Sequence, residues 1–362
     1  MRQIRAAVCR AFGAPLTIEE INIAPPGSGE IAVDLSACAI CHSDILFAEG
    51  AWGGSLPAVF GHEAAGRVTA VGAGVTRIAV GDPVVVTLIR ACGSCPSCAV
   101  GRPVTCEETF PLDRHSPLTD ANDVALTHGL RTGAFAEAVV VEASQAVVIP
   151  ESLGLDSASL LACGVITGVG AVVNTASLRP GQSAVIVGAG GVGLNAVQGA
   201  AIAGASMNIA VDLADDKLAA AVEFGATHSI NSSRDDLAAT VGEVTGGRGA
   251  DFVFVTVSAK PAFDQSYGLL APGGSVVLVG MPASGVMSEI DPGTLAAMGQ
   301  RVLGSKMGNS RISVDIPWLV DLYQQGRLKL DELITGRYAL DDINEAIASV
   351  KRGEALRNVI VF

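Results

Sequence analysis

Two side chains that can bind a metal stand close together near the start of the chain. Cys41 opens the sequence Cys-His-Ser-Asp, and His62 lies within Gly-His-Glu. A cysteine thiolate and a histidine imidazole are both good ligands for zinc. Because two protein ligands do not make a site, a third has to come from elsewhere in the chain. The candidate is Cys163, and a Cys2His set would leave a fourth coordination position open for chemistry.

Four further cysteines form a tight cluster, Cys92-x-x-Cys95-x-x-Cys98 followed by Cys106. Two intervening residues let successive sulfurs converge on one ion, and four thiolates make a closed tetrahedral site. We therefore predict a structural zinc in this cysteine lobe. Four buried thiols, a redox pair and an iron–sulfur cluster are the alternatives.

A glycine-rich turn follows the apolar run Ala184–Val187 and reads Gly188-Ala189-Gly190-Gly191-Val192-Gly193. With a strand before it and an apolar helix after it, such a turn lets the backbone approach a pyrophosphate at a helix N-terminus. The next predicted strand ends at Asp212, whose carboxylate can bind a ribose 2′-hydroxyl and would repel a 2′-phosphate. Leu213 and Ala214 are not basic. NAD is therefore favoured over NADP, and a Gly-rich turn without a ligand is the alternative.

The composition excludes several classes of partner. The chain has 362 residues, of which 49% are hydrophobic, and a formal net charge of −13 without a basic stripe. Nucleic acid and anionic membranes are therefore poor partners. No apolar run approaches the roughly 20 residues of a membrane-spanning helix, and the N-terminus does not read as a signal peptide. We expect a cytoplasmic protein with reduced thiols, in which Cys9 and Cys38 are small buried apolar side chains.

The first part of the chain predicts short strands joined by loops, which is typical of an antiparallel, barrel-like β domain. The strands are expected at 31–35, 66–71, 84–88, 139–141 and 146–149. Residues 107–134 are polar, contain Pro and Gly and lack a clear period. We interpret them as an excursion from this domain.

From about residue 165 strands and helices alternate, which predicts a doubly wound parallel sheet. The expected strands are Ala184–Val187, Asn208–Val211, His228–Ile230, Asp251–Val257, Ser275–Val279 and Arg301–Gly304. The expected helices are Val192–Ala203, Asp215–Phe224, Asp235–Val241, Ala262–Leu270 and Pro317–Gln325. The tail Asn358–Phe362 reads as a strand without a place in that sheet, so we infer that it returns to the first domain.

These motifs together resemble the zinc-dependent medium-chain alcohol dehydrogenases, in their liver-type and aryl-alcohol-dehydrogenase-like branch. The matching features are C-H-S-D at 41–44, G-H-E at 61–63, the cysteine lobe at 92–106, A-C-G-V-I-T-G at 162–168, G-A-G-G-V-G at 188–193 and Asp212. The resemblance implies a two-domain α/β fold: a GroES-like β-barrel catalytic domain at 1–164 and 306–362, and a Rossmann domain that binds NAD at 165–305. It implies oxidation of a primary alcohol, with aromatic and medium-chain alcohols as candidates, to the aldehyde.

The resemblance also assigns roles by position. The catalytic zinc ligands match Cys41, His62 and Cys163, which with the zinc of the lobe makes two ions per chain. Ser43 matches the hydroxyl that takes the substrate proton. Asp44 and Glu63 match carboxylates near the zinc, where they would tune it electrostatically.

Cofactor and substrate contacts follow in the same way. Besides the glycine-rich turn and Asp212, the positions that match cofactor contacts are His42, Thr167, Lys217, Val279 and Arg357. An ordinary surface lysine is the alternative for Lys217. Trp52, Leu88 and Met281 match positions that line the substrate pocket, and ordinary core packing is their alternative.

Some positions depart from the family. Liver-type members carry a histidine near the place of Leu46, so the exit of the proton is left unassigned. Formaldehyde dehydrogenases have an arginine in place of Phe110 and an acid in place of Trp52, and polyol dehydrogenases have a glutamate in place of Cys163. Both branches are therefore disfavoured, with S-(hydroxymethyl)thiol oxidation kept as the alternative.

Two functions from other classes stay open. One is a zinc hydrolase or lyase that keeps the nucleotide-binding fold as a scaffold, and the other is a non-catalytic NAD-binding protein. The expected partners are a small alcohol or aldehyde and a second copy of the chain. A homodimer is expected because the segment from Cys106 to Phe135 is about as long as in dimeric members of the family, and a tetramer stays open.

Overall fold

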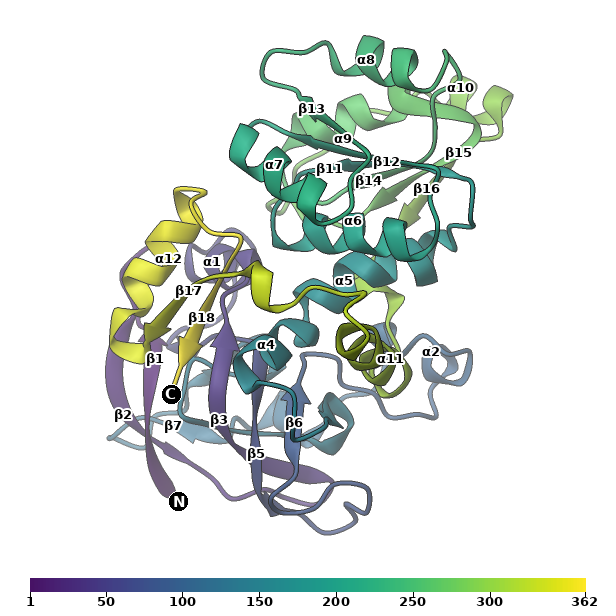
Figure 1. Cartoon of the computed structure of the whole chain (residues 1–362). Helices are drawn as coiled ribbons and strands as arrows, with labels where there is room; N and C mark the ends of the chain where they lie inside the picture. Colours follow the sequence, from purple (N-terminus) through teal and green to yellow (C-terminus); the bar gives the residue numbers. More distant parts are fainter. The chain divides into compact units, whose positions relative to one another are not determined.

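The computed structural model describes all 362 residues and divides them into two compact units. Unit 1 contains Met1–Cys163 and Arg311–Phe362, and unit 2 contains Gly164–Ser310. The sequence-based boundaries at 164/165 and 305/306 lie one residue and five residues from these. Within unit 1, the C-terminal strands drawn in yellow lie beside the purple strands of the N-terminal part (Figure 1).

Unit 1 is built on two β-sheets, ordered β7-β2-β1-β4-β8 and β10-β6-β5-β3-β18-β17, with β9 also paired to β3. The strands are β1 (Arg2–Cys9), β2 (Thr17–Ile23), β3 (Glu30–Ala39), β4 (Ala58–Val59), β5 (Glu63–Val71), β6 (Pro83–Val86), β7 (Leu118–Thr119), β8 (Thr127–His128), β9 (Ala138–Glu142), β10 (Ala146–Val148), β17 (Ile334–Ala339) and β18 (Arg357–Val361). Most neighbouring strands run antiparallel, which confirms the predicted antiparallel β domain.

Alternation along β3 decides which of its faces is buried. Ile31, Val33 and Leu35 are at most 6% exposed and pack in the core of unit 1, whereas Ala32 and Asp34 are partly exposed on the other face.

β18 pairs antiparallel with β3, so the tail returns to the first domain as predicted. The helices of this unit are α1 (His42–Ala48), α2 (Pro96–Ala99), α3 (Pro111–Arg114), α4 (Leu155–Ser159), α11 (Ile312–Gln324) and α12 (Ile343–Lys351).

Unit 2 contains one parallel sheet of six strands in the order β13-β12-β11-β14-β15-β16, which confirms the predicted doubly wound fold. The strands are β11 (Ser183–Val187), β12 (Met207–Asp212), β13 (His228–Asn231), β14 (Ala250–Val255), β15 (Leu270–Leu278) and β16 (Arg301–Gly304). The helices are α5 (Gly164–Gly170), α6 (Gly191–Ile202), α7 (Asp215–Glu223), α8 (Leu237–Val244), α9 (Lys260–Ser266) and α10 (Pro292–Met298). The central strands β11 and β14 are buried on both faces, as expected for a sheet covered by helices.

One helix begins earlier than the sequence predicts. α11 begins at Ile312, so Pro317 lies inside the helix and not at its start. A proline there removes one backbone hydrogen bond, but Ile316, Leu319 and Val320 are buried and hold the helix in place. Proline is common in the first turn of helices, which explains the misplaced start.

No single helix of the chain has both the length and the apolar composition needed to cross a membrane. One bent pair, Leu155–Ala162 with Gly164–Ala176, meets the length and composition criteria together.

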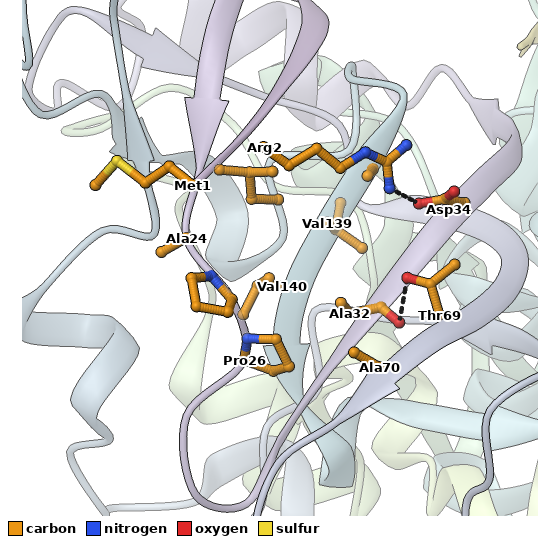
Figure 2. A pocket seen from close by; sticks show the side chains of 13 residues that line it. Met1, Arg2, Ala24, Pro26, Ala32, Asp34, Thr69, Ala70, Val139 and Val140 are labelled. Atoms are coloured by element: carbon orange, nitrogen blue, oxygen red, sulfur yellow. Dashed lines mark hydrogen bonds and ion pairs between the residues drawn. The ribbon is translucent and has the colours of Figure 1, made fainter.

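A cavity of about 240 Å³ lies on unit 1, between the N-terminus, the end of β2 and strands β3, β5 and β9. Figure 2 shows an ion pair between Arg2 and Asp34 at this cavity, and the Thr69 hydroxyl donating to the carbonyl of Ala32. Most other lining side chains are small and apolar. None of the predicted metal or nucleotide residues lines this cavity.

Candidate active site

The structure brings the three predicted zinc ligands of the first motif together inside unit 1. Cys41 precedes α1, His62 precedes β5, and Cys163 follows the short helical turn Leu160–Ala162. All three are buried, at most 6% exposed. Their ligand atoms and a carboxylate oxygen of Glu63 lie within 4.8 Å of one another. We call these four residues the buried cluster.

The ring of His62 is fixed by the carboxylate of Asp44, which is itself buried. Asp44 Oδ1 lies 2.9 Å from His62 Nδ1 and also accepts a hydrogen bond from the amide of Gly61 at 2.9 Å. Its second oxygen accepts from the amide of Cys41 at 3.0 Å. One side chain therefore holds both predicted ligands in place, as carboxylates beside ligating histidines do.

The other ring nitrogen of His62, Nε2, is buried and has no hydrogen-bond partner in the protein. Leaving a buried polar atom unpaired costs roughly 1–3 kcal/mol. A metal ion among the two thiols and the imidazole would satisfy this nitrogen, so the donor set fits zinc.

Electrostatics within the buried cluster also favour a metal. A hydrogen bond with Cys163 and the nearby His62 hold the pKa of the Cys41 thiol well below its ordinary value, against the effect of burial. The thiolate is the form that binds metals. Burial opposes the charged form of His62, but Asp44 and Cys41 outweigh it and raise the pKa of the imidazole well above its usual range.

Glu63 is the fourth member of the buried cluster, and Arg357 is its ion-pair partner. Arg357 was expected to bind the cofactor pyrophosphate; the structure places it in β18, 5% exposed, against this carboxylate. Burial raises the pKa of Glu63 to about 7, while the charge of Arg357 opposes the shift. The arginine engages Glu63, so the two cysteines and the histidine are the better candidate ligands. The pyrophosphate role of Arg357 stays a prediction.

The expected proton acceptor lies in the first turn of α1. Ser43 is partly buried, and the preceding His42 is exposed. Both follow Cys41 directly, so α1 fixes their positions relative to the buried cluster. Their roles stay predictions.

The four cysteines of the lobe converge as their spacing predicts. Their sulfurs lie within 4.8 Å of one another. The amide of Cys95 donates to Cys92 Sγ at 3.2 Å, and the amide of Cys98 donates to Cys95 Sγ at 3.4 Å. Backbone hydrogen bonds from Ser94 and Cys95 lower the pKa of Cys92 to about 6. The loop therefore stabilises the Cys92 thiolate, which suits a bound zinc ion. Desolvation by burial raises the pKa of Cys98 to about 12, and a bound zinc ion would favour its thiolate form.

The glycine-rich turn of unit 2 joins β11 to α6. A Cβ at Gly193 would lie 1.7 Å from the carbonyl oxygen of Gly188, so this close approach of helix to strand requires glycine. A Cβ at Gly190 would meet nothing within 4 Å, which leaves open space beside the start of α6. The turn thus fits a pyrophosphate at the helix N-terminus.

Asp212 ends β12 beside this turn. One of its oxygens accepts from the amide of Ala189 at 2.7 Å, and the other accepts from the amides of Leu213 and Ala214. The carboxylate therefore holds the turn to the neighbouring strand. The predicted contact with a ribose hydroxyl would add to this role.

The other residues predicted to contact the cofactor or the substrate differ in burial and belong to both units. Thr167 is buried in α5, and its hydroxyl lies 3.8 Å from the sulfur of Met307. The amide of Val279 donates to Val255 at the end of β14, and Lys217 is a partly exposed residue of α7. Of the residues expected to line a pocket, Trp52 and Leu88 are partly buried in unit 1, and Met281 is 58% exposed in unit 2.

Sequence reasoning missed Arg90, which is 1% exposed and one of the largest fully buried side chains. Its guanidinium bonds to Gln145, Asp113 and the carbonyl of Arg131. Its partners lie up to 55 residues away, so no local pattern could have indicated the network. The apolar run before it suggested only the end of a strand.

Comparison with known proteins agrees with this arrangement. Residues 27–151 match the family described as alcohol dehydrogenase GroES-like domain, and residues 191–325 match the family described as zinc-binding dehydrogenase. The NDMA-dependent alcohol dehydrogenase of Amycolatopsis methanolica is 35% identical over 99% of this chain and 98% of its own length. The probable S-(hydroxymethyl)glutathione dehydrogenase 1 of Schizosaccharomyces pombe is 36% identical over 98% and 96%. The solved structure of benzyl alcohol dehydrogenase from Acinetobacter calcoaceticus matches with a TM-score of 0.93 at 32% identity over 100% of both chains.

The fold, the two metal-binding groups and the nucleotide turn define a two-domain zinc-binding dehydrogenase. The chain belongs to the zinc-dependent medium-chain alcohol dehydrogenase family. It is an enzyme of this class, for which zinc and NAD(P) are the typical cofactors.

Proposed function

We propose that the protein oxidises a primary alcohol to its aldehyde and transfers the hydride to NAD+. The observation that carries the proposal is the buried cluster, in which two thiols and an unpaired imidazole nitrogen face one another. The names of the relatives, alcohol dehydrogenase and benzyl alcohol dehydrogenase, support the same reaction class.

The chemistry follows from the cluster and its neighbours. A zinc ion held by Cys41, His62 and Cys163 would act as a Lewis acid that lowers the pKa of an alcohol hydroxyl. Asp44 keeps Nδ1 of His62 engaged, so that Nε2 faces the ligand position. Ser43 would accept the hydroxyl proton and pass it on, a general-base role that requires hydrogen-bond reach of the substrate oxygen.

Aromatic side chains near the buried cluster favour an aromatic or medium-chain substrate. Phe60 lies two residues before His62. The ring of Phe47 stacks on the ring of Phe60, with 5.9 Å between the ring centroids. Trp52 packs edge-on against Phe47 at 5.0 Å. Aromatic rings prefer such offset and edge-on contacts, and an aromatic alcohol would make contacts of the same kind with these side chains.

We infer NAD as the preferred cofactor. The carboxylate of Asp212 would repel the 2′-phosphate of NADP, and the next residues offer no positive charge. The roles of Thr167, Lys217, Val279, His42 and Arg357 in binding it are part of the proposal.

A substrate panel tests the proposed reaction. Primary, secondary and aromatic alcohols are offered with NAD+ or NADP+, and formation of the reduced cofactor is followed. We expect the highest kcat/KM with an aromatic primary alcohol and NAD+, and two zinc ions per chain by mass spectrometry. Protein that holds two zinc ions and reduces neither cofactor with any alcohol would contradict the proposal.

Oxidation of an S-(hydroxymethyl) thiol is the second candidate, because two relatives are named S-(hydroxymethyl)glutathione dehydrogenase. Phe110 disfavours it, since that branch carries an arginine there, and here the ring lies 5.5 Å from the guanidinium of Arg90. Formaldehyde with glutathione is the discriminating substrate. We expect a kcat/KM below that for aromatic alcohols, and the reverse order would replace our substrate assignment.

We propose further that the protein forms a homodimer through the edge of the sheet in unit 2. β16 has a strand neighbour on one side only. Exposed apolar side chains occur on this strand and in the segment that precedes it, namely Met287, Ile290, Met298 and Val302. An exposed strand edge with apolar neighbours pairs readily with another copy. Light scattering should give a dimer mass, and Val302→Lys should shift it towards the monomer; a tetramer is the alternative outcome.

We infer that the protein works in a reducing compartment such as the cytoplasm. None of its eight cysteines forms a disulfide, and a disulfide within either metal-binding group would remove ligands. Cell fractionation with an antibody against the protein would test the location.

A further inference from the structure

A strained turn lies between β8 and β9 in unit 1. Leu130 and Arg131 both adopt left-handed backbone conformations, with φ of 51° and 60°. Such a conformation costs a non-glycine residue roughly 1–2 kcal/mol. Two consecutive residues in this conformation persist only where the surrounding structure holds them, and such backbone strain is frequent at functional sites.

Two buried side chains hold this turn. The carbonyl of Arg131 accepts hydrogen bonds from Arg90 Nη2 at 3.2 Å and from Gln145 Nε2 at 3.0 Å. Arg90 Nε donates to Gln145 Oε1 at 2.9 Å, which locks the two side chains together. The Gln145 amide also donates to the carbonyl of Thr87. With Arg90 at 1% and Gln145 at 0% exposure, water cannot replace these bonds. We call this pair the clamp.

The far end of the turn meets the backbone beside the buried cluster. The amide of Ala134 donates to the carbonyl of Gly61 at 2.9 Å, and the amide of Phe135 donates to the carbonyl of Phe60 at 2.8 Å. A Cβ at Gly61 would lie only 2.5 Å from the Phe135 amide nitrogen, so the two segments are in close contact. Gly61 is also the residue whose amide shares Asp44 Oδ1 with the ring of His62.

These contacts form one continuous path from the clamp to His62. We propose that Arg90 and Gln145 are positioning residues for the metal ligand His62, acting through the strained turn at residues 129–133. Without the clamp the turn relaxes, Gly61 shifts, and Nε2 of His62 leaves its place among the thiols. The inference rests on the proposed function in one respect, namely that the buried cluster binds zinc.

Arg90→Lys is the main test, because lysine keeps the charge but loses the planar fork that reaches Gln145, Asp113 and Arg131 together. The measurement is the rate at which each of the two zinc ions passes to a chromophoric chelator. We expect the ion of the buried cluster to leave about 10–100-fold faster, the usual range for losing an outer partner of a ligand. The ion of the cysteine lobe should keep its wild-type rate. Arg67→Lys, which alters an exposed arginine paired with Glu151, is the matched control and should change neither rate.

Gln145→Glu provides a second variant of nearly the same shape. It removes the amide donors to Arg131 and Thr87, and the same ion should leave faster. Cobalt exchanged into the buried cluster, with zinc kept in the lobe, should show altered d–d absorption bands in both variants. A general loss of stability would leave the spectrum of the folded protein unchanged.

Rescue separates strain from other effects of the substitution. Leu130→Gly removes the cost of one left-handed residue, so the turn needs less support from the clamp. Added to Arg90→Lys, it should return the zinc release rate to within about threefold of wild type. Release rates of Arg90→Lys and Gln145→Glu within twofold of wild type would overturn the inference, as would failure of this rescue. If the wild-type protein itself holds only the lobe zinc, the proposed function fails instead.

Discussion

The buried cluster and the cysteine lobe are both built to hold a metal, but they obtain their ligands in opposite ways. The lobe takes four cysteines from fifteen consecutive positions, 92–106, and is partly exposed. The buried cluster takes Cys41, His62 and Cys163 from three separate places in the chain, and each of these side chains is at most 6% exposed. A local loop is sufficient for the first, whereas the second needs the fold of unit 1.

The two groups also differ in what satisfies their donor atoms. In the lobe, backbone amides donate to the sulfurs of Cys92 and Cys95. In the buried cluster, Asp44 holds one nitrogen of His62 and the other is left without a protein partner. A site whose sulfurs accept hydrogen bonds from its own loop suits a structural ion. A site with one unsatisfied nitrogen, held from outside by a carboxylate, suits an ion that takes part in chemistry.

The sharpest test of this contrast removes a ligand of the buried cluster. Cys163→Ser should lower kcat/KM for alcohol oxidation by at least about 10³-fold, because the Lewis acid supplies several kcal/mol of stabilisation. Mass spectrometry should count one zinc ion per chain, the one in the lobe. Cys9→Ala, which alters a fully buried cysteine outside both groups, should keep two ions and nearly full activity. Full activity in Cys163→Ser would show that the cluster is not the catalytic site.

A smaller effect is expected from the carboxylate behind His62. Asp44→Asn keeps the shape of the side chain but removes the charge that fixes the ring. We expect zinc affinity at the buried cluster to fall about 10–100-fold, measured by competition with a chelator. Asp34→Asn, which alters a partly exposed carboxylate paired with Arg2, serves as the control. Equal affinities in both variants would count against a positioning role for Asp44.

The lobe should matter more for stability than for turnover. Cys95→Ser should release the lobe zinc and lower the thermal midpoint by roughly 5 °C. At low temperature, kcat should fall by less than about tenfold, because the buried cluster keeps its ion. Calorimetry and turnover measured on the same preparation check both statements. A loss of activity as large as in Cys163→Ser would remove the distinction between the two groups.

The smallest effect concerns His128, which precedes the strained turn. Burial and the charge of Arg90 lower the pKa of this imidazole to about 4, from an ordinary value of 6.5. The unfolded chain binds a proton at this histidine more readily than the folded chain does. The contribution of neutral His128 to the free energy of unfolding is therefore complete above pH 6.5 and is lost as the pH falls towards 4. The loss at pH 5 is about 2 kcal/mol.

His128→Gln should therefore show a smaller decrease of the thermal midpoint between pH 7 and pH 5 than the wild type, with zinc in excess. His228→Gln, which alters an exposed histidine, should keep the wild-type decrease. Identical pH dependence in all three proteins would mean that His128 is not neutral in the folded state.

Sequence patterns were sufficient for features that depend on neighbouring residues. The spacing of the lobe cysteines, the glycine-rich turn before α6 and the alternation of strands and helices in unit 2 each carry a local physical requirement. The structure accordingly has these elements where they were expected. The tail could be placed in unit 1 only by elimination, because the six-stranded sheet had no position for it.

Features made by distant residues were not predictable in the same way. The clamp joins Arg90 to Gln145, and the network of Asp44 reaches from α1 to Gly61 and His62. Neither has a sequence period or a fixed spacing. The start of α11 was misplaced for a different reason, because buried side chains outweighed the local preference of Pro317.

The hydrogen bonds of Asp212 have a consequence for how cofactor use can change over evolution. The residue that would discriminate against NADP is also the one that ties the amide of Ala189, and with it the glycine-rich turn, to β12. A mutation to a smaller neutral residue would therefore loosen the turn at the same time as it removed the negative charge. Variants that accept both cofactors should arise more readily through basic residues at 213 or 214, which leave the carboxylate in place.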